Sequence, residues 1–494
     1  MVSADQASGE AARLLGQDGP FAEALDGFAP REAQIRMAEA VQATLETGET
    51  LVAEAGTGIG KTLAYLVPAL LSGLKVIIST GTKTLQDQLF FRDLPLVREA
   101  LDSSASTALL KGRGNYLCLH RMHTARTEGR LPSRDAAIEL RAVQDWSART
   151  VDGDLSIAGV VGEDSGLMPF VTSTADNCLG ADCPEIDRCF VARARRDAQE
   201  ADVVVVNHHL LFADMAIKQS GFGEVLPGAG AFIVDEAHQA PETASRFFSL
   251  TVSARQVQDL CRDFLAESAE VSGAMGVLRE PVADCLQKLK ELQLAIADRG
   301  EERGSWSALL DDPDARGALQ ALDRSVLALA GEIPQLEGRA RGMDGCLERL
   351  RAVQSAFDRF DAAEGEGEVR WYEQRGRGFA LHITPLEVAT AFDAFREQVD
   401  AAWLFTSATL SVRGDFRHFT DRMGLQDAAT LQIDSPFDYV NNARLWLPES
   451  LPEPRDPGFV PALLDDVVPL LEASRGRAFL LFTAHRSLRL AAEL

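Results

Sequence analysis

Short apolar runs alternate with amphipathic stretches along residues 28–95. The runs "TLVAEA" and "KVIIST" have the length and β-branched content of buried strands, and "KTLAYLVPALLSG" between them has the pattern of a helix. Strands that alternate with helices indicate βαβ units on a parallel sheet. The later runs "DVVVVN" and "AFIVDEAH" predict two more strands of that sheet. The pattern therefore predicts an α/β fold that is interrupted between residues 95 and 202.

A second pattern covers residues 241–370, where apolar positions recur every three or four residues, as in "ARQVQDLCRDFLAE". This spacing is typical of helices that bury one face. The pattern ends in the acidic stretch "EGEGEVR", strand character returns in "AAWLFTSATLS", and a last strand–helix pattern begins at "GRAFLLFTAHRSLRLAAEL". We therefore expect a second, helical insertion before the sheet is completed.

Composition places the chain among ordinary globular proteins. Its 494 residues are 46% hydrophobic and 25% charged, which allows roughly three domains. The longest apolar run, "LAYLVPALL", is shorter than the ~18 residues that span a bilayer, and the N-terminus lacks the features of a signal peptide. We expect a cytoplasmic protein with no membrane partner.

Four of the seven cysteines lie in the first insertion: Cys118, Cys178, Cys183 and Cys189. Seven cysteines are too few and too unevenly placed for a disulfide framework in a chain of this length. Four thiolates can hold an iron–sulfur cluster, and they can equally complete a tetrahedral zinc site, although zinc ligands usually come in closely spaced pairs. The spacings, with 59, 4 and 5 residues between successive cysteines, leave both kinds of site open.

Positive charge gathers beside the same cysteines, in a chain whose net charge is −25. The basic residues that flank Cys118 and Cys189 are Lys111, Arg113, His120, Arg121, Arg188, Arg193, Arg195 and Arg196. Such patches are ordinary solvated surface when they stand alone. Because phosphate binding depends on Lys and Arg, their position beside four cysteines also fits a local nucleic-acid surface.

The stretch "AEAGTGIGKT" fits a phosphate-binding loop, since a predicted strand precedes it and a helix follows. Its glycines allow backbone N–H groups to face phosphate oxygens at a helix N-terminus. In this pattern Lys61 meets the β- and γ-phosphates of ATP and Thr62 holds Mg²⁺. The predicted nucleotide contacts from the loop are Ala55, Gly56, Thr57, Gly58, Gly60, Lys61 and Thr62.

A pair of carboxylates follows the strand "AFIVD". At the carboxyl end of a buried strand beside a phosphate loop, Asp235 can position Mg²⁺ and Glu236 can activate the attacking water. The pair of carboxylates therefore predicts that ATP is hydrolysed and not only bound. A small-molecule kinase is a weaker alternative, because no acceptor-binding element is evident.

Further motifs narrow this reading. The sequence Asp-Glu-Ala-His after a phosphate loop, "STGTKTLQDQL" at 79–89, "TSAT" at 406–409 and "VNHHLL" after the last clustered cysteine resemble the XPD-type iron–sulfur helicases of superfamily 2. "KGRGNYLC", "VNHHLLFAD" and "SPFDY" are similar to their bacterial DinG/YoaA branch. The resemblance implies an α/β fold: a RecA-like P-loop motor domain with a four-cysteine iron–sulfur insertion and a helical arch insertion, followed by an incomplete second RecA-like domain. The expected boundaries are 1–110, 200–240 and 371–425 for the motor, 111–199 for the iron–sulfur domain, 241–370 for the arch and 426–494 for the second motor domain.

The resemblance also implies roles for individual residues. Cys118, Cys178, Cys183 and Cys189 would hold a [4Fe–4S] cluster, and the adenine-contacting element would include Phe28, Arg31 and Gln34. His238 would couple the nucleotide site to the "TSAT" motif. The implied DNA contacts are Thr80, Thr82, Lys83, Lys111, Arg113, Arg193, Arg195 and Arg196, with Tyr116 or Phe190 as stacking aromatics. The remaining cysteines, Cys261, Cys285 and Cys346, are expected to be buried packing residues.

The activity implied by the resemblance is that of an ATP-dependent DNA helicase that moves 5′ to 3′ on single strands, in DNA repair or replication. Its implied partners are single-stranded and forked DNA and a replication clamp-loader or repair protein. The chain stops inside an apparent helix, with no glycine-arginine motif of the kind that completes the second motor domain. The alternative expectation is therefore a truncated, non-unwinding iron–sulfur module that binds DNA.

Overall fold

The computed structural model describes residues 9–25, 27–128, 131–162, 164–174, 177–219, 225–268, 271, 273–332, 341–362, 367–376, 378–385, 388–448 and 450–494. The chain divides into two compact units, Met1–Pro436 and Phe437–Leu494. No described helix is long and apolar enough to cross a membrane.

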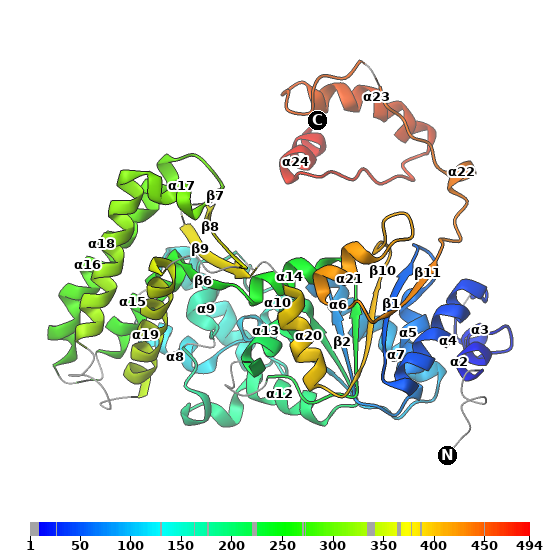
Figure 1. The fold of residues 1–494 in the computed structure, drawn as a ribbon, viewed down its shortest axis with the longest axis horizontal. Helices are drawn as coiled ribbons and strands as arrows, with labels where there is room; N and C mark the ends of the chain where they lie inside the picture. The colour runs from blue at the N-terminus through cyan, green and yellow to red at the C-terminus, as the bar shows by residue number, and fades with distance from the viewer. Residues whose placement is uncertain are drawn as a thin grey trace. The chain divides into compact units, whose positions relative to one another are not determined.

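A seven-stranded parallel sheet organises the first unit, in the order β11-β1-β10-β5-β2-β4-β3 (Figure 1). Its strands are β1 (Thr50–Ala55), β2 (Val76–Thr80), β3 (Thr107–Leu109), β4 (Val203–Asn207), β5 (Ala231–Asp235), β10 (Ala402–Ser407) and β11 (Ala429–Ile433). The run "VVVV" in β4 is buried on both faces, because alternate valines enter the two separate cores on either side of the sheet.

Helices cover both faces of this sheet (Figure 1). One core contains side chains from α2 (Glu10–Leu14), α3 (Pro20–Ala24), α4 (Glu32–Thr47), α5 (Lys61–Leu71) and α7 (Leu94–Ala100). The other contains side chains from α12 (Phe190–Glu200), α13 (His208–Gln219), α14 (Ala240–Phe247), α20 (Val388–Gln398) and α21 (Arg417–Met423). Between β2 and α7 lie α6 (Lys83–Gln88) and the π-helical turn η1 (Leu89–Asp93), and η5 (Ala237–Gln239) follows β5.

The first insertion forms a small domain with a hydrophobic core of its own. Its elements are η2 (Arg113–Asn115), α8 (Leu119–Glu128), α9 (Arg134–Ser147), α10 (Leu155–Ala158), α11 (Met168–Val171), η3 (Gly180–Asp182), η4 (Ile186–Arg188) and the start of α12. We call residues 111–200 the cysteine domain. Its core includes Tyr116 and Phe190, so these two rings are packing residues and not the exposed stacking aromatics that we predicted.

The second insertion is only partly helical, and its predicted boundary at residue 370 is wrong. Its helices are α15 (Ala254–Glu267), α16 (Ala274–Asp298), α17 (Trp306–Asp311), α18 (Pro313–Gly331) and α19 (Arg341–Asp361). They pack on a four-stranded antiparallel sheet, β6-β9-β8-β7, formed by β6 (Leu250–Ser253), β7 (Arg303–Ser305), β8 (Glu368–Arg375) and β9 (Gly378–Pro385). Because β8 and β9 enter the same hydrophobic core as the helices, this arch domain extends to Pro385.

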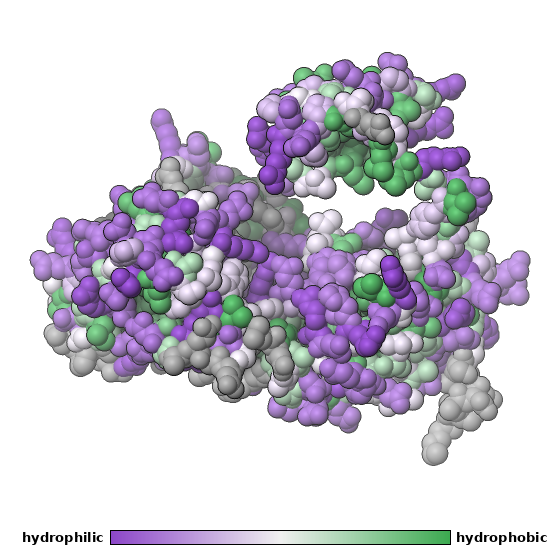
Figure 2. Space-filling model, turned by 45° about the horizontal axis from the view of Figure 1, so that its top comes forward, coloured by the Kyte–Doolittle hydropathy of each residue, from purple (hydrophilic) through white to green (hydrophobic). Residues whose placement is uncertain are grey.

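The second unit contains α22 (Tyr439–Asn442), α23 (Phe459–Ala473) and α24 (His485–Glu493). The strand predicted within "GRAFLLF" is not formed in the described part of this unit, which contains no other strand to pair with it. Hydrophobic side chains lie on its surface (Figure 2), and Phe479 and Leu481 are 96% and 94% exposed. Residues 426–436 belong to the first unit, since β11 pairs with β1.

Candidate functional site

Three neighbouring strands bring the nucleotide motifs to one edge of the large sheet (Figure 1). β10 lies between β1 and β5, and the pairing places Glu54 opposite Ser407, and Thr406 opposite Asp235. The carboxyl ends of parallel strands meet at the same edge, so the loops that follow these strands adjoin one another. The phosphate loop, the "TSAT" motif and the Asp-Glu-Ala-His box therefore form one site.

The loop between β1 and α5 has the backbone of a phosphate-binding site. Gly58 and Gly60 have left-handed φ angles of 87° and 89°, which residues with a Cβ rarely adopt. Gly60 directly precedes α5, so the unpaired N–H groups of the helix N-terminus face the loop. Lys61 Nζ donates to Ala55 O over 3.2 Å and so reaches back across the loop. This arrangement suits the binding of phosphate oxygens.

The last residue of β11 and Ser435 just beyond it close the other side of the loop. Gly56 N donates to Ile433 O over 3.0 Å, and Ser435 Oγ donates to Thr57 O over 2.7 Å. A Cβ on Gly56 would lie 2.5 Å from Ser435 N, so only glycine fits this approach. Ser435 was not among the predicted site residues, although it begins the stretch "SPFDY".

The predicted adenine-contacting element reaches the loop with two of its three residues. Arg31 Nη1 donates to Gly58 O, and the buried Gln34 donates through Nε2 to Gly60 O over 3.0 Å. Phe28 packs instead against Phe21, with ring centroids 6.1 Å apart. Arg31 and Gln34 therefore attach the element to the loop by hydrogen bonds to backbone carbonyls, whereas the Phe28 ring packs against Phe21.

Asp235 is held at the end of β5 by a tyrosine from α5. Tyr65 Oη donates to Asp235 Oδ2 over 3.0 Å, and Tyr65 also hydrogen bonds to the side chain of Thr62. Burial, assisted by the neighbouring Glu236 carboxylate, raises the pKa of Asp235 to about 6. A divalent cation would reverse this by favouring the ionised carboxylate, so the two predicted Mg²⁺ ligands lie in a place that suits a cation.

Glu236 occupies a strained backbone position next to its partners. Its φ of 56° and ψ of 41° are left-handed, an uncommon and costly conformation for a residue with a Cβ. Ser407 Oγ lies 3.3 Å from Glu236 Oε2 and 2.8 Å from His238 Nδ1. The predicted coupling between His238 and the "TSAT" motif therefore has a direct contact through Ser407.

The four clustered cysteines line one cavity of about 560 Å³ in the cysteine domain. Burial raises the pKa of the Cys118 and Cys183 thiols, and the neighbouring cysteines raise it further. Among the described residues no three His, Cys, Asp or Glu side chains converge closely enough to hold a single metal ion. All four cysteines therefore border one shared volume.

Comparison with known proteins identifies the family. The DEAD/DEAH box helicase family model matches residues 34–105. The ATP-dependent DNA helicase YoaA of Escherichia coli K12 is 45% identical over 480 residues, which are 96% of this chain and 75% of that protein. The chain belongs to the DinG/YoaA family of ATP-dependent helicases. YoaA of Haemophilus influenzae is 41% identical over 98% of this chain and 75% of its own length, and the ATP-dependent helicase DinG of Mycobacterium tuberculosis H37Rv is 34% identical over 94% and 73%.

A further carboxylate of this helicase, Glu54, adjoins the site and was not among the predicted residues. Glu54 Oε2 accepts hydrogen bonds from Leu410 N and Ser411 N, both over 2.6 Å, and Oε1 accepts from Ser411 Oγ and from Gln432 Nε2 over 2.9 and 3.1 Å. These contacts outweigh burial and lower the pKa of Glu54. Glu54 thus joins the phosphate-loop strand to the segment after "TSAT" and to β11. Its signal in the sequence is an acidic residue inside the otherwise apolar run "TLVAEA".

Four arginines near the clustered cysteines differ in how far they are available to a nucleic acid. Arg113 and Arg195 line the cysteine cavity, where burial and the charge of Arg113 lower the pKa of Arg195. Arg193 donates to Val151 O and lies over the Phe190 ring at 5.2 Å, whereas Arg196 is exposed. Of these four, Arg196 is the one most available to a nucleic acid.

The predicted DNA contacts Lys111 and Thr80 are wrong, because both side chains are buried. The side chain of Lys111 is 0% exposed and lies between the carboxylates of Asp87 and Asp154. Thr80 is 1% exposed, and its hydroxyl donates to Thr82 O over 3.2 Å. Neither side chain is presented to a strand of DNA. Thr82 is exposed and caps α6 by accepting from Leu85 N over 3.2 Å.

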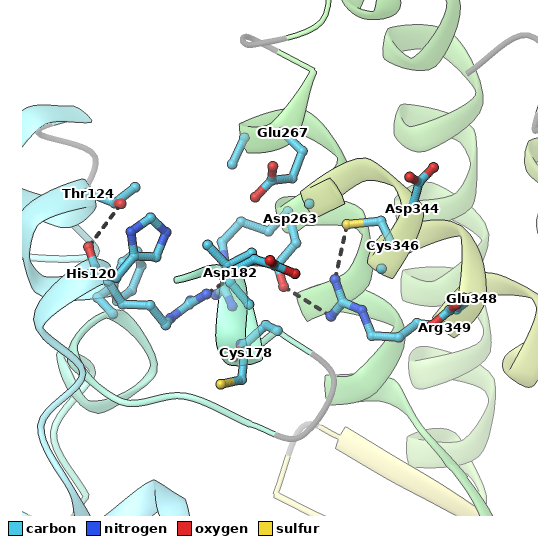
Figure 3. A pocket seen from close by; sticks show the side chains of 18 of the residues that line it. His120, Thr124, Cys178, Asp182, Asp263, Glu267, Asp344, Cys346, Glu348 and Arg349 are labelled. Carbon is cyan, nitrogen blue, oxygen red and sulfur yellow. Dashed lines mark hydrogen bonds and ion pairs between the residues drawn. The ribbon is translucent and has the colours of Figure 1, made fainter. Parts of the chain in front are cut away.

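The cysteine domain contacts the arch around a cavity of about 340 Å³ (Figure 3). Asp263 of the arch accepts from Arg349 over 3.0 Å and lies 3.9 Å from Arg121 of the cysteine domain. Cys346 is buried as predicted and accepts from Arg349 over 3.1 Å, while Cys178 lines the opposite side. The two insertions therefore meet through a charged contact beside one of the clustered cysteines.

Proposed function

We propose that this chain acts as an ATP-dependent DNA helicase that moves 5′ to 3′ along single-stranded DNA and unwinds duplex DNA during repair or replication. The observation that carries this proposal is the adjacency of β1, β10 and β5, which gathers the phosphate loop, "TSAT" and the Asp-Glu-Ala-His box at one sheet edge. The names of the relatives, ATP-dependent DNA helicase YoaA and DinG, support it. Forked DNA and a clamp-loader or repair protein are the partners we propose.

In this proposal the residues of the loop bind the triphosphate. Lys61 would exchange its contact with Ala55 O for the β- and γ-phosphates, and the N–H groups at the start of α5 would donate to phosphate oxygens. Thr62 and Asp235 would hold Mg²⁺, which supplies neutralisation of the charge that develops on the phosphates. Glu236 would accept a proton from the attacking water, since it follows Asp235 directly and its position is fixed by Ser407.

The contact among Glu236, Ser407 and His238 supports a coupling of hydrolysis to movement. Ser407 belongs to β10, and Glu54 ties the residues just beyond it to the phosphate-loop strand. Loss of the γ-phosphate would therefore affect "TSAT" through two contacts, that of Glu236 with Ser407 and that of Glu54 with Leu410 and Ser411. The DNA contacts that remain in the proposal are Thr82, Lys83 and Arg196, with Arg113, Arg193 and Arg195 closer to the cysteine cavity.

We propose a [4Fe–4S] cluster as the occupant of the cysteine cavity. Four thiols line one volume, whereas no described group converges on a single point as a zinc site requires. Cys118, Cys178, Cys183 and Cys189 would each supply one thiolate to the cluster. Arg113 and Arg195 line the same cavity and would offset the negative charge of the thiolates. The cluster would give this small domain a fixed shape.

The test is ATP hydrolysis by the chain, purified without oxygen, with and without single-stranded DNA. We expect DNA to stimulate hydrolysis, unwinding of duplexes with a 5′ but not a 3′ single-stranded tail, and about four irons per chain with little zinc. Glu236→Gln should lower the hydrolysis rate at least a hundredfold while ATP and DNA still bind. Glu242→Gln, which alters an exposed carboxylate on α14, is the matched control.

Each part of the proposal has its own contrary result. Zinc in place of iron would reject the cluster and leave the motor untouched, and unwinding from 3′ tails would reject the polarity. DNA binding without stimulated hydrolysis would favour the alternative, a non-unwinding iron–sulfur module. Loss of both DNA binding and hydrolysis in an iron-loaded, folded protein would reject the helicase proposal itself.

A further inference from the structure

The buried side chain of Lys111 forms two ion pairs, which together we call the ion-pair centre. None of the nucleotide-site residues takes part in it. Lys111 Nζ lies 2.7 Å from Asp87 Oδ1 and 2.7 Å from Asp154 Oδ2. The ammonium also donates to Ser156 Oγ over 2.9 Å. The ammonium of Lys111 therefore has two ion-pair partners and one hydrogen-bond partner. A charge placed in this way in the interior holds its neighbours in one geometry, because each loses its partner if the others move.

The partners of Lys111 come from two different domains. Asp87 belongs to α6 of the motor, while Asp154 and Ser156 belong to the cysteine domain. Lys111 N also donates to the hydroxyl of Tyr116 over 3.0 Å. Tyr116 lies two residues before Cys118 and forms a β-bridge with Asp154. The ion-pair centre therefore connects α6 with the segment that carries the first clustered cysteine.

The helix α6 begins at the surface where we place DNA. Thr82 caps it, and Lys83 is its first residue. Gln86, fully buried, donates through Nε2 to Leu110 O and Val205 O over 3.0 and 3.2 Å, so α6 is already anchored to the motor sheet without Asp87. The pairing of Asp87 with Lys111 is therefore additional to what holds the helix in place. A π-helical turn, η1, follows α6 directly, as is frequent near functional sites.

We propose that Lys111 is a positioning residue that joins α6 to the cysteine domain, so that a strand of DNA bound at the start of α6 stabilises the segment that carries Cys118. This inference rests on the proposed function, since it needs DNA at Thr82 and Lys83. By linkage, the same contact makes the state of the cysteine domain change the affinity for DNA by an equal factor. Lys111 then acts on DNA through Asp87 and not by touching a phosphate.

The experiment is amide hydrogen exchange of the full chain with and without a saturating thymidine oligonucleotide. In the wild type we expect DNA to slow exchange about tenfold both in α6 and in residues 113–122. Asp87→Asn removes the charge of the one partner that belongs to the motor, while Lys111 keeps its ion pair with Asp154 and its hydrogen bond to Ser156. In this variant we expect protection of α6 to persist and protection of residues 113–122 to fall below about twofold, with affinity for DNA about fivefold weaker. Asp87→Glu should restore both.

Asp93→Asn is the matched control, because its carboxylate accepts from Gln88 within the same segment. It should retain the wild-type pattern. Protection of residues 113–122 that is unchanged in Asp87→Asn would overturn the role of Lys111, since DNA would then act on that segment directly. Protection of α6 alone in the wild type would overturn the inference and leave the helicase proposal standing. Absence of DNA protection at α6 would reject the DNA contact on which both proposals depend.

Discussion

Tyr65 hydrogen bonds to the side chains of Asp235 and Thr62 from a fully buried position. Replacing it with Phe removes the hydroxyl that fixes Asp235 while the shape of the core is kept. The bond to Asp235 is worth about 1 kcal/mol, so we expect affinity for Mg·ATP to fall about fivefold in Tyr65→Phe, measured by calorimetric titration. Tyr372→Phe, which removes a buried phenol hydroxyl from the arch, should leave the affinity unchanged. Equal affinities in Tyr65→Phe and the wild type would show that Asp235 is positioned without it.

His208 gives the motor domain a dependence on pH. Burial lowers its pKa to about 4, whereas the unfolded side chain titrates near 6.5. As the pH falls below about 6.5, His208 becomes protonated in the unfolded state while it stays neutral in the folded state. The free energy of unfolding therefore falls toward pH 4. His208→Asn escapes this cost, although it loses the 2.7 Å contact with Ser79.

We therefore expect the thermal midpoints of the wild type and His208→Asn to approach each other between pH 7.5 and 5.5. The cost in that interval is about 1 kcal/mol, which corresponds to roughly 2–4 °C for a domain of this size. Asp235 titrates in the opposite sense in both proteins, so its contribution cancels in the difference. The exposed His418→Asn should follow the wild type at every pH. A constant gap between the midpoints would mean that His208 is not held neutral.

At the scale of elements, local signals were sufficient for the motor strands. "TLVAEA", "VIIST", "VVVV" and "AFIVD" are buried strands as predicted, because a parallel sheet covered on both faces produces continuous apolar runs. The sheet of the arch was missed, since β6 and β7 have four and three residues and find their partners far along the chain. Its one readable signal is "FALHIT", where Phe379, Leu381 and Ile383 alternate inward.

The same contrast separates the site residues. The phosphate loop and the Asp-Glu-Ala-His box were predictable, because each depends on a few neighbouring residues after a strand. The position of Lys111 was not, because its burial requires Asp87 and Asp154, which approach it only in the fold. Charge in a sequence indicates chemistry, but the partners that neutralise it come from distant segments.

The arch offers a prediction about its boundaries. Its core is drawn from residues between Val252 and Ile383, including Tyr372 and Phe379 from the hairpin. A fragment of residues 248–387 should therefore fold alone and unfold cooperatively on heating, whereas a fragment of residues 241–370 should not. Circular dichroism at increasing temperature compares them. Cooperative unfolding of the shorter fragment would show that the sheet is dispensable and that the boundary at 370 was adequate.

At the scale of the whole molecule, charge opposes the binding of DNA. The net charge of −25 repels phosphates at long range, and most arginines near the cysteines are paired, buried or directed at the cavity. Binding must then depend on a few local cations together with N–H groups and helix termini, which carry no net charge. Such a protein should differ from a basic nucleic-acid binder in its response to salt.

We expect a shallow salt dependence for the affinity of the full chain for single-stranded DNA. Each phosphate neutralised by Lys or Arg contributes about −0.7 to the slope of log K against log salt, so two or three contacts predict a slope near −2. Lys83→Gln and Arg196→Gln should each flatten the slope by about 0.7, measured by fluorescence anisotropy from low to moderate salt. Arg324→Gln, on an exposed arch helix, should leave it unchanged. A slope steeper than about −5 would require a cationic surface beyond these residues, and the strand would then follow a different path over the protein.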